Sequence, residues 1–236
     1  MIGAPILLGL VVAPSIRGGL IAAGALLLFL SRQPLKIAAQ DVIRKKRYPR
    51  TAWAGGFALS EIGVAVVFIG ISYAEAGSRL LVPLVVLAAL SLGQFALETF
   101  GNGRAILPEL VGSAAASIFA TLIALASGYE MYQAWLLAGA LTVHAWLAVV
   151  YVTRRLNHHQ STLAVVCSAA TSVALATVVW VGGQMQWPIM TASAVLALRA
   201  LWGVSRWQTQ RRPQLVGVQE VAYTVFVVVA IALSIE

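Results

Sequence analysis

Long apolar runs separated by short basic clusters dominate this sequence. Hydrophobic residues make up 60% of the chain and charged residues only 10%, whereas soluble domains carry about 25% charged residues. The apolar runs approach the roughly 20 residues that a helix needs to cross about 30 Å of hydrocarbon. Since every backbone N–H and C=O must be satisfied in lipid, we expect each run to be an α-helix. The sequence therefore predicts an all-α fold, a polytopic transmembrane helix bundle.

The apolar runs predict about nine helices and leave no room for a soluble domain. Residues 1–236 are therefore expected to form a single integral membrane domain. The first two runs are short, so one hairpin interrupted at residues 14–19 is an alternative, and the second run may be extended past Arg32 through residues 35–39. The expected helices are 2–14, 18–31, 51–73, 80–97, 107–126, 132–152, 162–183, 187–202 and 218–235.

Basic residues concentrate in alternate loops, and this bias predicts the orientation of the bundle. Basic loops of membrane proteins stay in the cytoplasm. Only Arg17 and Arg79 fall in the opposite loops. We therefore expect the N-terminus inside, the C-terminus outside, and anionic phospholipids as partners of the basic loops. The basic loop residues are Arg32, Lys36, Arg44, Lys45, Lys46, Arg47, Arg50, Arg104, Arg154, Arg155, Arg206, Arg211 and Arg212.

Nucleic-acid, metal and disulfide sites are not predicted. A nucleic-acid binder carries its basic residues on one solvated face, whereas these residues are divided among short loops. Cys167 is the only cysteine, which excludes a disulfide within the chain. His158 and His159 are adjacent, and a single pair of ligands does not define a zinc site.

Two segments are rich in small residues, at 112–117 and 167–172. Helices associate in membranes through close backbone contact between small residues. The helices that contain these stretches are therefore predicted to lie in the interior of the bundle.

Ionisable residues within the apolar runs are the candidate functional groups. A charge at the bilayer centre costs about 2.5–3.5 kcal/mol. Glu61 and His144 lie about ten and twelve residues into their runs and are expected near the midplane. Both a satisfied structural contact and a role in substrate or proton handling are open for these two residues.

A second group of ionisable residues is expected near the cytoplasmic face. Three carboxylates from different helices are predicted to pair around Arg199. Interhelical salt bridges or snorkelling side chains are one interpretation, and a polar pocket that binds an anion through arginine is the other. The residues of this candidate pocket are Arg32, Glu98, Glu109, Arg154, Arg155, Arg199 and Glu220.

Three stretches resemble the YwiC-like bacterial membrane proteins: LFLSRQPL at 28–35, PELVGSA at 108–114 and RPQLVGVQEVAY at 212–223. The resemblance runs along most of the chain. It implies a polytopic protein of the bacterial inner membrane and assigns no activity. Family members typically open with a Pro-Arg/Lys-Glu-His-Gly segment, whereas this chain begins with Met1-Ile2-Gly3, which indicates a late start or a shortened first helix.

A weaker likeness is to the UbiA-type intramembrane prenyltransferases, which have nine helices in this orientation. The likeness implies Asp-rich motifs after the second and sixth helices, where carboxylates hold Mg²⁺ and a prenyl diphosphate. The corresponding loops here contain Asp41 in one case and Arg154 and Arg155 in the other, and they lack the Asp pairs. Mg²⁺ is expected only under this alternative, and otherwise no cofactor is predicted.

Three functions follow from these observations. The leading hypothesis is a non-enzymatic membrane protein of YwiC-like type that binds a lipid or isoprenoid anion at its cytoplasmic mouth. The enzyme alternative is a UbiA-like prenyltransferase with a non-standard diphosphate site. The third is a small-solute or proton-coupled transporter lined by Glu61 and His144, which discontinuous helices would support. A role as a subunit of a membrane complex is also open.

Overall fold

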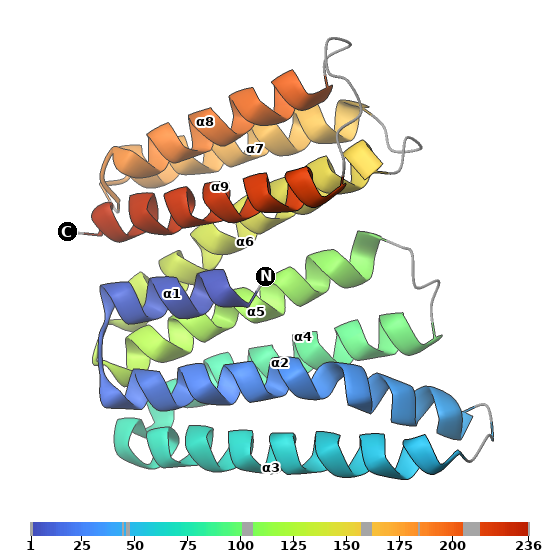
Figure 1. The fold of residues 1–236 in the computed structure, drawn as a ribbon. Helices are drawn as coiled ribbons and strands as arrows, with labels where there is room; N and C mark the ends of the chain where they lie inside the picture. The colour runs from blue at the N-terminus through green and yellow to red at the C-terminus, as the bar shows by residue number, and fades with distance from the viewer. Residues whose placement is uncertain are drawn as a thin grey trace. The chain divides into compact units, whose positions relative to one another are not determined.

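The computed structural model is built from helices (Figure 1). It describes residues 2–43, 45, 48–100, 106–156, 162–183, 185–204 and 213–235, except the side chains of 154–156, 162, 203–204 and 213–216. No strand occurs in these ranges, so the predicted all-α fold is confirmed for them. The helices are α1 Gly3–Val12, α2 Ile16–Ile43, α3 Pro49–Ala76, the 3₁₀-helix η1 Gly77–Leu80, α4 Leu81–Phe100, α5 Ile106–Ala126, α6 Met131–Leu156, α7 Thr162–Val181, α8 Pro188–Val204 and α9 Pro213–Leu233.

Several helices have the length and composition of membrane spans. Five stretches of the described chain qualify, namely Ile16–Ile43, Pro49–Phe100, Ile106–Ala126, Met131–Thr153 and Leu163–Val181. Shorter apolar helices are Gly3–Val12, Pro188–Trp202 and Gly217–Leu233. These helices bear out the prediction of a membrane protein. The predicted number of about nine crossings and the UbiA-like arrangement stay predictions.

The longest of these stretches, Pro49–Phe100, contains two helices. α3 ends at Gly77, which has a positive φ of 76°, a backbone conformation that glycine adopts readily. The chain then turns through η1, and α4 runs back in the opposite direction (Figure 1). This glycine therefore separates two helices that are each long enough to cross the bilayer.

Most helix bounds lie within four residues of the predicted ones, and two differ more. The second helix was predicted to end at residue 31, and that bound is wrong, because α2 continues to Ile43 with Pro34 inside it. The alternative, an extension of the second helix past Arg32, is confirmed. The ninth helix was predicted from residue 218 and begins at Pro213. Proline is tolerated in the first turn because its missing N–H has no helical partner there.

The chain divides into two compact units, Met1–Ala138 and Gly139–Glu236, which are described separately. The first turns of α6 belong to unit 1 and the rest of α6 to unit 2. In unit 1, α5 contacts α1, α2 and α4, while α2 also packs along α3. All residues of α5 from Ser117 to Ala126 are buried. The interior position predicted from the small residues at 112–117 is therefore confirmed.

α2 and α3 pack through small residues. Ala58, Ala65 and Ser72 are the buried residues of α3, and their spacing of seven places them on one face. On α2, a Cβ at Gly24 would lie 3.3 Å from the Ala65 carbonyl oxygen. The absence of a side chain at Gly24 thus permits close approach of the two helices, as expected for packing in lipid.

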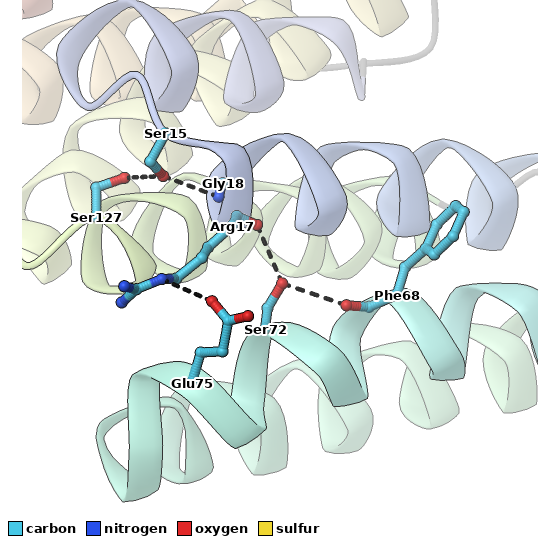
Figure 2. A network of polar contacts seen from close by, with 7 residues as sticks. All are labelled: Ser15, Arg17, Gly18, Phe68, Ser72, Glu75 and Ser127. Carbon is cyan, nitrogen blue, oxygen red and sulfur yellow. Dashed lines mark hydrogen bonds and ion pairs between the residues drawn. The ribbon is translucent and has the colours of Figure 1, made fainter.

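A polar network closes the end of unit 1 where α1 meets α2 (Figure 2). The hydroxyls of Ser15 and Ser127 are 2.7 Å apart, and Ser15 also accepts from the Gly18 N–H at 2.9 Å. The Arg17 guanidinium pairs with Glu75 at 2.9 Å. These contacts join three helices at the end opposite to the basic turn between α2 and α3.

The short helix α1 ends in the same network. Its 10 residues span about 15 Å, half the hydrocarbon thickness. Tyr129 donates its hydroxyl to the Val12 carbonyl at 2.9 Å, and Ser127 donates to the Ala13 carbonyl at 2.8 Å. Side chains thus satisfy carbonyls that a helix end leaves unpaired.

In unit 2, α8 packs against α7 and α9, and a side-chain contact between His144 and Ser193 joins α6 to α8. α7 buries only one strip, formed by Val165, Ala169, Ser172 and Ala176, and Cys167 is exposed. The interior position predicted from the small residues at 167–172 is therefore wrong. Small residues permit close packing on any face, but only this one strip of α7 is buried.

Candidate functional site

Four polar side chains join α2 and α4 at the end of unit 1 near the basic turn. Arg32 and Lys36 lie one turn apart on α2, and Gln94 and Glu98 lie one turn apart on α4. Arg32 Nη2 donates to Glu98 Oε1, and Lys36 Nζ donates to Glu98 Oε2 at 3.4 Å. Gln94 Nε2 donates to Glu98 Oε1 at 3.1 Å. We call these four residues the α2–α4 cluster.

The α2–α4 cluster carries more positive than negative charge. Its one carboxylate, Glu98, is 9% exposed, whereas the side chains of Arg32 and Lys36 are 42% and 30% exposed. Two cations share one buried anion, so the cluster has a net charge of +1. The exposed parts of the two cations present N–H donors to a further anion.

Gln94 is held against the backbone of α5 at Gly112. A Cβ at Gly112 would lie 2.5 Å from Gln94 Cδ and 2.7 Å from its Oε1. Gln94 keeps this position only because residue 112 has no side chain. The small residues at 112–117 had predicted helix packing and not this contact, and nothing in the sequence pattern had singled out Gln94.

Contacts at the two ends of α2 and α3 fix the register of this helix pair. Near the turn, Arg50 donates to Asp41 at 3.2 and 3.3 Å. At the far end, Ser72 donates to the Arg17 carbonyl at 3.1 Å. For an antiparallel pair, these two contacts place Arg32 level with about residues 57–59 of α3.

The aromatic residues of α3 give the depth of the cluster. Trp53 is 73% exposed and lies 20 residues before Tyr73, a separation of about 30 Å. That distance equals the hydrocarbon thickness, and Trp and Tyr favour the two interfaces. By the register above, Lys36 lies close to the level of Trp53, and Arg32 lies about 6–9 Å deeper. If Trp53 and Tyr73 mark the two interfaces, the cluster would lie at the boundary between acyl chains and headgroups.

Asp41 belongs to a separate contact set that holds the α2–α3 turn. It accepts from Arg50 as described and from the Thr51 hydroxyl at 2.8 Å, and the Arg50 guanidinium lies 4.7 Å from the Tyr48 ring centroid. Arg44, Lys46 and Arg47 of this turn lie outside the described residues. Among the described residues, no group of three or more His, Cys, Asp or Glu side chains is arranged to hold a metal ion.

A second ion pair, between α8 and α9, lies in unit 2. Arg199 Nη2 donates to Glu220 Oε1, and the two side chains are 12% and 20% exposed. The guanidinium lies 4.5 Å from the Tyr151 ring centroid and 4.2 Å from that of Tyr223, within the range of a cation–π contact. This α8–α9 ion pair has one cation for one anion and no net charge.

The two residues predicted near the midplane have different surroundings. His144 is buried, with Nδ1 2.6 Å from the Ala140 carbonyl and Nε2 3.3 Å from the Ser193 hydroxyl. Glu61 is half-buried, and its Oε2 has no hydrogen-bond partner among the described residues. His144 thus has a hydrogen-bond partner at each ring nitrogen, whereas one carboxylate oxygen of Glu61 has none among the described residues.

The structure brings four of the seven predicted pocket residues into two pairs, one in each unit, as described above. Glu109 is exposed in the first turn of α5. The side chains of Arg154 and Arg155 lie outside the described residues. A single pocket that unites all seven stays a prediction.

Comparison with known proteins gives one family. A family model described as YwiC-like protein matches residues 1–124. No curated protein sequence and no solved structure matches the chain. The matched range includes all four residues of the α2–α4 cluster and Gly112.

Proposed function

Since the chain belongs to the YwiC-like family, we propose that it is a polytopic protein of the bacterial inner membrane that binds an anionic lipid or isoprenoid headgroup. The binding site is the α2–α4 cluster. The observation that carries this proposal is the sharing of one buried carboxylate by two partly exposed cations, Arg32 and Lys36. A bound phosphate with one negative charge would neutralise the cluster.

The depth of the cluster favours a ligand that arrives from the bilayer. Lys36 lies near the level of the headgroups and Arg32 deeper, where water is scarce. The guanidinium fork of arginine matches the geometry of phosphate oxygens, and a basic residue near an anionic membrane surface contributes about 1 kcal/mol. A headgroup phosphate at the boundary therefore meets both cations without leaving the membrane.

The remainder of α2 supports the same site. The helix continues for seven residues beyond Lys36 to Ile43, about 10 Å further, and the sequence then adds Arg44, Lys45, Lys46 and Arg47. In the sequence, positive charge thus continues beyond the end of α2. Basic loops of this kind are retained in the cytoplasm, so we place the cluster on the cytoplasmic side, with the N-terminus inside and the C-terminus outside.

Binding is tested by titrating the detergent-purified protein with three ligands, namely phosphatidylglycerol, a prenyl phosphate and inorganic phosphate, while thermal unfolding is followed. We expect the two lipidic ligands to raise the melting temperature and inorganic phosphate to have little effect. The double variant R32Q/K36Q should weaken the lipid affinity by about 10- to 30-fold, since two basic contacts of about 1 kcal/mol each are lost.

The matched control is R17Q, which removes an arginine from the opposite end of unit 1. Arg17 pairs with Glu75 and is about half exposed, so its loss should leave the lipid affinity unchanged. Weakening by R17Q equal to that by the single variant R32Q would show that binding follows net charge and not this cluster. A response to inorganic phosphate as strong as that to lipid would point to a soluble anion instead.

The orientation has its own test. A reporter that is active only in the cytoplasm, fused after the C-terminal residue, should be inactive if the C-terminus lies outside. The same reporter at the N-terminus should be active. The opposite result for either fusion would reverse or break the predicted topology.

A further inference from the structure

His144 belongs to unit 2 and is buried. It faces Ser193 on α8, which is fully buried. Ser193 lies 11 residues before the end of α8 at Val204, about 16 Å along the helix, close to half the hydrocarbon thickness. We propose that His144 accepts protons at Nε2 and that these protons reach it from the end of unit 2 that carries the α8–α9 ion pair.

The hydrogen bonds of His144 define which nitrogen accepts a proton. Nδ1 faces only the Ala140 carbonyl at 2.6 Å, and a carbonyl accepts but does not donate. Nδ1 therefore carries the hydrogen of the neutral ring. Nε2 faces the Ser193 hydroxyl at 3.3 Å, which is able to donate to it.

The contact with Ser193 is compatible with both protonation states. When Nε2 gains a proton, it becomes a donor, and the Ser193 oxygen becomes its acceptor. A serine inside a helix can turn its hydroxyl hydrogen to the carbonyl of the preceding turn. The change therefore needs a rotation of one hydroxyl and leaves no polar atom without a partner.

A small cavity leads from His144 toward the α8–α9 ion pair. Its volume is about 10 Å³, and its lining includes His144, Tyr151 and Arg199, with Ala148 and Ala200 in the wall. This volume is about what one water molecule requires. Most of the lining is apolar, and His144, Tyr151 and Arg199 are the lining residues able to form hydrogen bonds with a water.

The charged residues described near His144 are Arg199 and Glu220, which have no net charge together. α6 contributes Tyr151, α8 contributes Arg199, and α9 contributes Glu220 and Tyr223, while α7 contains no charged residue. Since Arg199 and Glu220 neutralise each other, a proton on His144 would give this group a single net charge. Glu220 pairs with Arg199, one of the residues that line the cavity, and its carboxylate would attract an entering hydronium.

The transfer itself is balanced. A hydronium in the cavity gives one proton to Nε2, so that an N–H bond forms and an O–H bond breaks, and a neutral water remains. The charge passes from the hydronium to the imidazolium. Release of the proton follows the same steps in reverse.

The test is ¹⁵N NMR of histidine-labelled protein in nanodiscs, with His158→Asn and His159→Asn so that His144 gives the only signal. As the solution is acidified, we expect the Nε2 resonance to move from the value of an unprotonated nitrogen toward that of a protonated one. The variant A148L, which fills the cavity, should lose this shift or make it far slower to appear. The control A194L adds the same bulk at an exposed position of α8 and should retain the shift.

Two outcomes would overturn the inference. An Nε2 resonance that stays unprotonated across the whole acid range would exclude proton uptake at His144. A shift that persists unchanged in A148L would exclude access through the cavity. Both readouts are independent of lipid binding at the α2–α4 cluster.

Discussion

Two of the ion pairs in the described residues, Arg32–Glu98 in unit 1 and Arg199–Glu220 in unit 2, are built from the same kinds of residue but differ in charge balance and exposure. In unit 1, Glu98 is shared by two cations that remain partly exposed. In unit 2, Arg199 pairs with Glu220 and lies against two tyrosine rings, and both partners of the pair are largely buried. An ion pair between apolar helices is therefore not by itself a binding site. Excess charge that stays accessible distinguishes the candidate site from a structural contact.

The largest effect on stability is expected from breaking the α8–α9 ion pair. Replacing Arg199 with Met would leave Glu220 buried without its cation and should lower the free energy of unfolding by about 3–5 kcal/mol. Reversible unfolding in mixed micelles measures this loss. The double variant R199M/E220L removes both charges and should recover most of the stability. A single variant as stable as the wild type would show that the pair is dispensable.

The second-largest effect on stability is expected at Gly112, whose lack of a side chain leaves space for Gln94. In G112A the added methyl displaces Gln94 from Glu98, which removes a hydrogen bond to a charged group worth about 1.5–3 kcal/mol. Its control is G93A, since a Cβ at Gly93 meets no atom within 4 Å. G112A should unfold more easily than G93A by roughly that amount. Equal stability of the two variants would contradict the role given to Gly112.

A smaller effect on stability is expected from Arg32 itself. In R32Q the buried Glu98 keeps Lys36 and Gln94 as donors. The free energy of unfolding should therefore fall by only about 1 kcal/mol, because the Arg32 side chain is partly exposed and exposed ion pairs contribute little. The lipid affinity should fall about fivefold, the equivalent of one basic contact. If R32Q were as destabilising as R199M, the contrast between the two ion pairs would disappear.

The smallest effect is expected at the opposite end of unit 1. Arg17 and Glu75 form an ion pair with both side chains about half exposed, and such pairs contribute about 0–1 kcal/mol. R17Q should therefore change the melting temperature very little. A large loss would indicate that the network of Figure 2 depends on this arginine more than its exposure implies.

The sequence predicted where the helices begin and end better than which helices contact one another. Apolar length predicted most helix bounds, because backbone satisfaction in lipid leaves few alternatives to a helix. Apolar length did not predict that α2 continues past Arg32 and Pro34, since a helix that extends beyond the apolar core can contain charged residues and a proline. The small residues of α5 and α7 look alike in sequence, yet only α5 is surrounded by other helices within its unit.

The candidate site was predicted in part. Depth along each run identified Glu98, Glu109, Arg199 and Glu220 as polar groups near a membrane face, and Arg32 was assigned to a basic loop. The structure pairs Arg32 with Glu98 and Arg199 with Glu220. Which carboxylate meets which arginine depends on helix neighbours that a single sequence does not contain. Gln94 and Gly112 were missed for the same reason, because their importance lies in a contact between α4 and α5.

The most direct test of the contrast is the amount of phosphatidylglycerol retained by the purified protein from bilayers of phosphatidylglycerol and phosphatidylcholine. We predict that the wild type and R17Q retain phosphatidylglycerol in excess of its share of the bilayer, and that R32Q/K36Q, folded to the same extent, loses this excess. Retention by R32Q/K36Q equal to that of the wild type would contradict the assignment of the α2–α4 cluster as the anion site.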